Sequence, residues 1–93
     1  MMQGRYKYTQ TGHNGIIGHI IISVTETAKA YTFKLLENTT RLDYDHFILL
    51  FKDNDTIRIN KERSPHAIKV WSDDDFTIYP YRAGIPFLFE KER

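Results

Sequence analysis

Residues 16–24, IIGHIIISV, form the longest apolar run in the chain and decide the fold class. Read as a β-strand, this run places apolar side chains on both of its faces, because successive side chains alternate across a strand. One face carries Ile16, Ile20, Ile22 and Val24, and the opposite face carries Ile17 and Ile21. A strand that is apolar on both faces is typical of a central or sandwiched position. We therefore expect a sheet that has this stretch in its interior.

The segments on either side repeat the strand pattern. Upstream, Tyr6 and Tyr8 alternate with Arg5 and Lys7, which places the rings on one face and the cations on the other. Residues 10–15 hold two glycines and an asparagine, a composition typical of a turn. Gly18 lies inside the apolar run, where a glycine indicates that another backbone segment approaches closely.

Residues 25–36 fit two patterns. The apolar positions 28, 31, 35 and 36 have helical spacing, and Thr25 is suited to an N-cap. Residues 31–35 also alternate between apolar and polar types, as a strand does. The local aromatic and threonine content favours a strand over residues 30–36. We expect at most one short helix, near residues 25–40.

Two hairpins with acidic loops follow. The first joins residues 46–52 to 56–60 through Asp53-Asn54-Asp55, with Phe51 opposite Ile57 and Leu49 opposite Ile59. The second joins residues 67–71 to 76–79 through Asp73-Asp74-Asp75. A three-residue loop there places Val70 opposite Ile78. In the last apolar segment, residues 85–89, Pro86 predicts an edge strand because proline cannot donate to a ladder.

The sequence thus predicts an all-β fold. We expect roughly seven to eight short strands, at about ten-residue spacing, in a small antiparallel barrel or sandwich. A chain of 93 residues is expected to form a single domain over residues 1–93. The predicted core consists of Ile20, Ile22, Phe33, Leu49, Phe51, Ile57, Ile59, Val70, Ile78 and Phe87.

Composition excludes several functional classes. The chain has no cysteine, which excludes disulfides, thiolate zinc sites, iron–sulfur clusters and cysteine nucleophiles. The net charge of +1 differs from the strongly basic profile of a typical nucleic-acid-binding domain. The first residues are polar, and the longest apolar run is about half the length that spans a bilayer. We expect a cytoplasmic protein without membrane association.

No motif for catalysis or for cofactor binding is found. The glycines of residues 12–18 lack the spacing of a phosphate-binding loop and precede a strand rather than a helix. The four histidines have no metal-ligand spacing, and the acidic clusters at residues 43–45, 53–55 and 73–75 offer too few oxygens for calcium. None of the serines lies in a G-x-S-x-G motif. We expect no catalytic residue, no metal, no cofactor and no enzymatic activity.

The remaining interpretation is a small binding or regulatory module that acts on a protein partner, with self-association as a homodimer included. Cysteine-free, motif-poor domains of this size are common among phage and mobile-element proteins that inhibit a host machine by occlusion. The alternative is a small β-barrel that binds single-stranded nucleic acid, because basic residues interleave with aromatic ones at residues 5–8, 31–34 and 79–82.

The candidate contact residues gather on the second hairpin. They are Trp71, Asp73, Asp74, Asp75, Tyr79 and Tyr81. Tryptophan and tyrosine are frequent anchors of protein interfaces, and an acidic rim steers a basic partner toward them. On this hairpin Trp71 and Tyr79 are expected within cross-strand reach. The competing interpretation places Trp71 in the core and treats the aspartates as a solvated turn.

Overall fold

The computed structural model describes residues 1–40, 56–62, 67–79 and 86–92. In this part of the chain all regular structure is β, and no helix occurs. The strands are β1 (Gln3–Gly12), β2 (Gly15–Glu26), β3 (Ala30–Asn38), β4 (Thr56–Asn60), β5 (Ile68–Ser72), β6 (Asp75–Ile78) and β7 (Phe87–Lys91). The all-β prediction is confirmed, and β3 confirms the predicted strand at residues 30–36.

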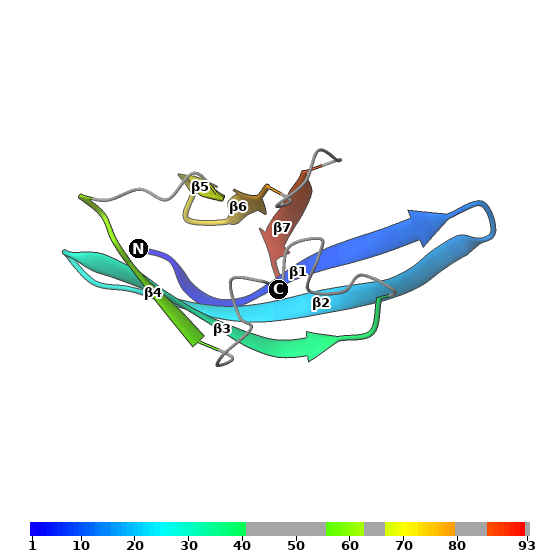
Figure 1. The fold of residues 1–93 in the computed structure, drawn as a ribbon, viewed down its shortest axis with the longest axis horizontal. Coiled ribbons are helices and arrows are strands. Elements are labelled where there is room, and N and C mark those ends of the chain that lie inside the picture. Colours follow the sequence, from blue (N-terminus) through cyan, green and yellow to red (C-terminus); the bar gives the residue numbers. More distant parts are fainter. Residues whose placement is uncertain (41–55, 63–66, 80–85, 93) are drawn as a thin grey trace.

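The seven strands of the described residues form one antiparallel sheet in the order β4-β3-β2-β1-β7-β6-β5. The sheet curls on itself as an open half-barrel, with β5, β6 and β7 above the concave face of the longer strands (Figure 1). The apolar run at residues 16–24 lies in β2, which pairs with β1 on one side and with β3 on the other. Its predicted interior position is confirmed.

The core fills the concave side of the curl. Its buried members are Met2, Tyr6, Ile20, Ile22, Val24, Phe33, Ile68, Phe76, Ile78, Phe87 and Phe89. Five of the predicted core residues are among them, and Ile57, Ile59 and Val70 pack against them while partly exposed. Leu49 and Phe51, with the predicted strand at residues 46–52 and its acidic loop, lie outside the described residues.

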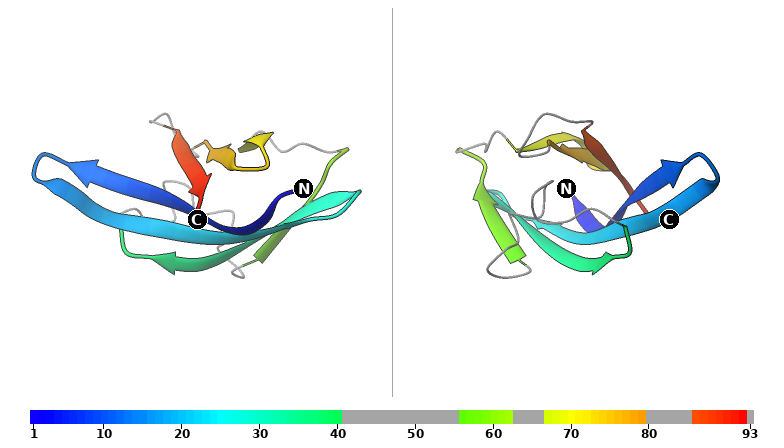
Figure 2. Two further views of the ribbon diagram at one scale, coloured as in Figure 1. Left: turned by 180° about the vertical axis from the view of Figure 1, so that it is seen from behind. Right: turned by 45° about the vertical axis from the view of Figure 1, so that its right-hand side comes forward.

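Phe76 of β6 is the centre of this core. Its ring stacks on Phe89 with centroids 4.9 Å apart, and it meets Phe33 edge-on at 5.2 Å and Tyr6 at 5.4 Å. β3 and β6 are separated by three strands in the sheet order. The contact between Phe33 and Phe76 therefore joins two distant parts of one sheet, and Figure 2 shows the curl that brings them together.

Gly18 has the close backbone approach that the sequence indicates. A Cβ atom at this position would overlap the backbone of Thr39. The Thr39 amide donates to the carbonyl of His19 at 2.9 Å, so the chain crosses directly over β2 after leaving β3. Any side chain larger than hydrogen at Gly18 would displace this crossing.

The strand that follows Pro86 is not at an edge of the sheet. β7 pairs with β1 on one side and with β6 on the other, so the predicted edge position is wrong. Pro86 lies just before the first residue of β7. Its missing N–H group therefore removes no hydrogen bond from either ladder.

The register of the hairpin between β5 and β6 also differs from the prediction. Val70 lies opposite Phe76, and Ile68 lies opposite Ile78. The predicted pairing of Val70 with Ile78 is therefore wrong by two residues. A slip of two residues keeps every side chain on its own face, so the apolar pattern does not distinguish the two registers.

The turn decides between these registers. Ser72 Oγ donates to Asp75 Oδ1 at 2.7 Å and accepts from the Asp74 amide at 3.0 Å, which closes a tight turn at Asp73 and Asp74. Ser72 consequently lies opposite Asp75, and Trp71 is left as the extra residue of a bulge.

Replacing Phe76 by alanine tests the central position of this ring. We expect Phe76→Ala to lower the free energy of unfolding by about 3–5 kcal/mol, because the substitution empties a site enclosed on several sides. Urea unfolding followed by circular dichroism measures the change. The control is Leu36→Ala on β3, where the side chain is exposed, and we expect it to cost less than about 0.5 kcal/mol. Equal costs for the two variants would contradict this description of the core.

Candidate functional site

Trp71 is held on the outer face of the hairpin formed by β5 and β6. Its side chain is 53% exposed, so the interpretation that places it in the core is wrong. The indole Nε1 donates to Thr77 Oγ1 at 2.7 Å, and the Lys69 ammonium lies 4.4 Å from the ring centroid. These two contacts fix the orientation of the exposed indole.

Thr77 joins Trp71 to a second exposed apolar side chain. Thr77 is only 6% exposed, and it lies opposite Leu88 of β7, which is 44% exposed. We call Lys69, Trp71, Thr77 and Leu88 the outer patch. Sequence reasoning missed Lys69, Thr77 and Leu88 as site residues. Alternation along each strand places Lys69 on the face of Trp71, but the strand order that adds Leu88 is a tertiary feature.

The three aspartates of the predicted site lie at the turn beside the outer patch. Some of their backbone and side-chain groups make hydrogen bonds or ion pairs within the fold. The backbone carbonyl of Asp73 accepts from the Tyr6 hydroxyl, and its carboxylate meets the Met1 amino group at 3.1 Å. The carbonyl of Asp74 accepts from the Lys91 amide at 2.8 Å. The Asp73 side chain is nevertheless 67% exposed, so its charge faces solvent.

Of the two tyrosines of the predicted site, the structure describes Tyr79, which is not gathered with Trp71. The Tyr79 amide donates to the carbonyl of Ala67 at 2.7 Å, which places Tyr79 beyond the end of β6 that lies away from the turn. The hydrogen bond of Trp71 reaches Thr77 rather than Tyr79. Tyr81 lies outside the described residues.

Tyr6 connects the acidic turn to the core. Its ring is fully buried against Phe76, while its hydroxyl donates to the carbonyl of Asp73. Burial raises the pKa of Tyr6 above its usual value, and the negative charges of Asp73 and Asp74 act in the same direction. The uncharged hydroxyl of Tyr6 therefore anchors the turn that carries the aspartates to the core.

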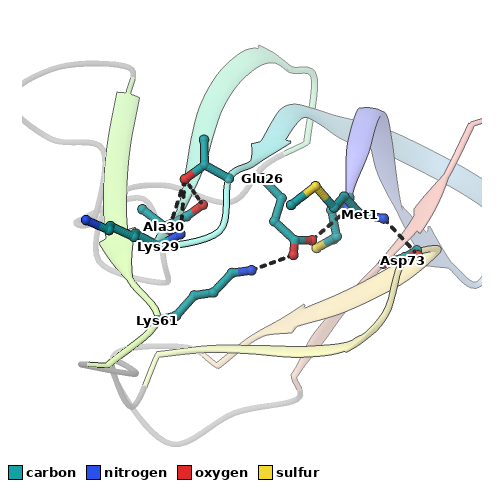
Figure 3. A network of polar contacts seen from close by, with 8 residues as sticks. Met1, Glu26, Lys29, Ala30, Lys61 and Asp73 are labelled. Atoms are coloured by element: carbon teal, nitrogen blue, oxygen red, sulfur yellow. Dashed lines mark hydrogen bonds and ion pairs between the residues drawn. The ribbon is translucent and has the colours of Figure 1, made fainter.

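A second polar network surrounds Glu26, at the end of β2 (Figure 3). Glu26 Oε1 accepts from the Met2 amide at 2.7 Å, and Glu26 Oε2 accepts from Lys61 Nζ at 2.6 Å. Lys61 follows β4, and its ammonium also lies 4.9 Å from the centroid of the Tyr31 ring. The hydrogen bond from Lys61, followed by that from Met2, lowers the pKa of Glu26.

The remaining candidates form no cluster in the described ranges. His19 Nε2 lies 3.0 Å from Glu37 Oε2. Within residues 1–40, 56–62, 67–79 and 86–92, no group of three or more histidine, aspartate or glutamate side chains could hold a metal ion. Among the same residues, no helix is long and apolar enough to cross a membrane. The acidic cluster at residues 43–45 lies outside them.

The basic and aromatic residues near the N-terminus face opposite ways, as their alternation predicts. Tyr6 is fully buried, and Tyr8 packs on Phe87 with ring centroids 5.1 Å apart. Arg5 and Lys7 are exposed on the other face of β1. The buried ring of Tyr6 is therefore not available for stacking on a base.

Comparison of the chain with family models, with curated proteins and with solved structures finds no match in any of the three. The outer patch and the adjoining turn are therefore interpreted from their own geometry.

Protonation of Glu26 should weaken the fold in acid. A lowered native pKa means that the stabilisation is present above the usual glutamate pKa, about 4.3, and is lost as the pH falls through the native pKa. We expect Glu26→Gln to unfold at lower urea than the wild type at pH 7. The gap between the two midpoints should shrink below about pH 4.

Unfolding midpoints across a pH series measure this effect. Glu62→Gln removes the same charge at an exposed position and serves as the control, with a gap that changes little. A gap for Glu26→Gln that stays constant down to the acid limit of folding would show that the pKa of Glu26 is not lowered.

Proposed function

We propose that the protein is a non-enzymatic module that binds a protein partner through the outer patch. The observation that carries this proposal is the exposed indole of Trp71, fixed by Thr77 and by Lys69. A rigid aromatic side chain loses little conformational entropy on binding. Such side chains are therefore enriched among the residues that contribute most to interface affinity.

The surroundings of Trp71 support a protein as the partner. Leu88 extends the apolar surface on the far side of the buried Thr77. The carboxylates of Asp73, Asp74 and Asp75 lie at the turn that joins β5 to β6. An apolar centre with a charged rim is the usual anatomy of a protein interface. The acidic rim would attract a basic partner and would repel the phosphates of nucleic acid.

The mode of action that this surface allows is occlusion. A module without catalytic groups acts by covering a surface that its partner needs, and an inhibitor of a larger machine works in this way. Self-association through the same patch is the homodimeric form of the proposal, and single-stranded nucleic acid remains the alternative partner class. The capture experiment below separates a protein partner from nucleic acid.

Truncation of Trp71 tests the proposal. The tagged protein is used to capture partners from a lysate of the cells that naturally make it, with and without nuclease and at raised salt. We expect Trp71→Ala to weaken capture of the partner by about 2 kcal/mol or more, roughly thirtyfold in Kd. Leu36→Ala, which removes an exposed side chain from β3, should capture as the wild type does. Its melting temperature and that of Trp71→Ala should both stay close to wild type.

Two outcomes would contradict the proposal. The first is a captured protein that Trp71→Ala retains in full. The second is a partner that disappears with nuclease or with moderate salt, which identifies nucleic acid. If Trp71→Ala is unfolded, Trp71→Phe replaces it, since phenylalanine keeps a ring but cannot donate to Thr77.

The acidic turn makes a separate prediction about association rate. Changing Asp73, Asp74 and Asp75 together to asparagine should slow association with the captured partner and reduce the dependence of the rate on salt. Melting should change little, because an asparagine at position 75 still offers an oxygen to Ser72. Stopped-flow or surface-based kinetics at two salt concentrations measure the effect. An unchanged association rate would exclude steering by this turn.

A further inference from the structure

A groove lies between β4 and β5, the two edge strands of the described sheet. Its volume is about 330 Å³. The apolar side chains that line it come from three strands and are Tyr31, Phe33, Ile59, Ile68 and Val70. Among the described residues, the half-barrel thus leaves an apolar floor between its two edge strands.

On β5, the backbone N–H and C=O groups of every second residue point toward this groove. The Tyr79 amide donates to the Ala67 carbonyl, and Ile68 lies opposite Ile78 in the antiparallel register. Hydrogen-bonded pairs alternate with non-hydrogen-bonded pairs in such a ladder. The N–H and C=O groups of Ile68 and Val70 therefore point away from β6, toward the groove.

The same reasoning applies to β4 on the opposite side. The Lys61 amide donates to the Lys29 carbonyl at 2.9 Å, and Asn60 lies opposite Ala30. Because pairs alternate, the backbone groups of Asn60 point away from β3. Asn60 also lines the groove. The groove is thus bordered by strand backbone on both sides, with apolar side chains at its base.

Charge defines what this groove would accept. Residues 57–69, which run from β4 through the connection to the first two residues of β5, carry a net charge of +3. Arg58 lies on β4 and Lys69 on β5, and both are exposed. Lys61, which follows β4 and whose ammonium is paired with Glu26, also lines the groove, so Arg58 and Lys69 supply the charge that is not paired with Glu26. Negative charge on a segment would therefore favour its binding in the groove.

We propose that the groove binds an extended acidic peptide, which pairs as an added strand with the outward edge of β5. Its backbone would bond to Ile68 and Val70, and its alternate side chains would be apolar and cover the floor. The remaining side chains would point outward and carry the carboxylates, near the cations of β4 and β5. This binding by strand addition is a second interaction, which shares Lys69 with the outer patch but makes no contact with the Trp71 indole.

The first test uses defined peptides. The probe is a fluorescently labelled, capped heptapeptide of alternating glutamate and valine, with a lysine–valine peptide and a proline-interrupted glutamate–valine peptide as controls. Fluorescence anisotropy with the whole chain should show saturable binding of the first peptide. Each control should bind at least about tenfold more weakly. Equal binding of the acidic and basic peptides, or no saturable binding, would overturn the proposal.

The second test locates the bound strand. Amide hydrogen exchange followed by NMR should slow at least about tenfold at Ile68 and Val70 when the acidic peptide saturates the protein. The amide of Lys69, which alternation directs toward β6, is the internal reference and should change less. Peptide binding without protection at Ile68 and Val70 would place the peptide elsewhere and overturn the proposal. Protection that grows with protein concentration alone would identify a second copy as the occupant and overturn it equally.

Variants separate this groove from the outer patch. Val70→Pro removes an N–H group that points into the groove but none that bonds to β6, so peptide binding should fall at least about tenfold. Trp71→Ala should bind the peptide as the wild type does. Unchanged binding to Val70→Pro, or a loss with Trp71→Ala that matches that of Val70→Pro, would contradict the proposal. If Val70→Pro fails to fold, the exchange measurement on the wild type decides the matter alone.

Discussion

The contact between Phe33 and Phe76 is the constraint on which the rest of the structure depends. A single sheet has no second layer to cover its apolar face, so this sheet covers itself by curling. Phe76 of β6 meets Phe33 of β3 at 5.2 Å and stacks on Phe89 of the adjacent strand. These rings bring distant strands of the sheet over one concave core. The curl stops before the edges pair within the described residues, and this leaves the groove between β4 and β5.

The curl also determines what the outer face presents. With Phe76 and Phe89 turned inward, alternation directs Thr77 and Leu88 outward on the same strands. Trp71 lies on that face two residues after Lys69 and donates to Thr77, and the Tyr6 hydroxyl ties the neighbouring turn to the core. The candidate contact residues therefore lie on short strands that the aromatic cluster holds in place. A binding surface supported in this way is preorganised, which lowers the entropic cost of association.

Much of the fold could be predicted from the alternation of apolar and polar residues alone. In a strand with one buried face, every second side chain is apolar, and this pattern is visible in the sequence. This pattern predicts Ile20, Ile22 and Phe33 in the core, and the structure confirms all three. The register of β5 and β6 was not predictable in this way, since a two-residue slip preserves each face. The interior position of β7 depends on strand order, to which Pro86 gave a misleading signal. For the site, the sequence identified Trp71, but its neighbours Thr77 and Leu88 follow from the register of β5 on β6 and from the strand order.

Nuclear Overhauser effects between the rings of Phe33 and Phe76 test the central claim most directly. In a sample with selectively labelled phenylalanine, the curled sheet predicts clear cross-peaks between these two rings, whose centroids lie 5.2 Å apart. It also predicts cross-peaks between Phe76 and Tyr6. A protein in which Phe76 shows contacts to Phe89 but none to Phe33 would have a flat sheet, and the enclosed core and the groove between β4 and β5 would both be contradicted.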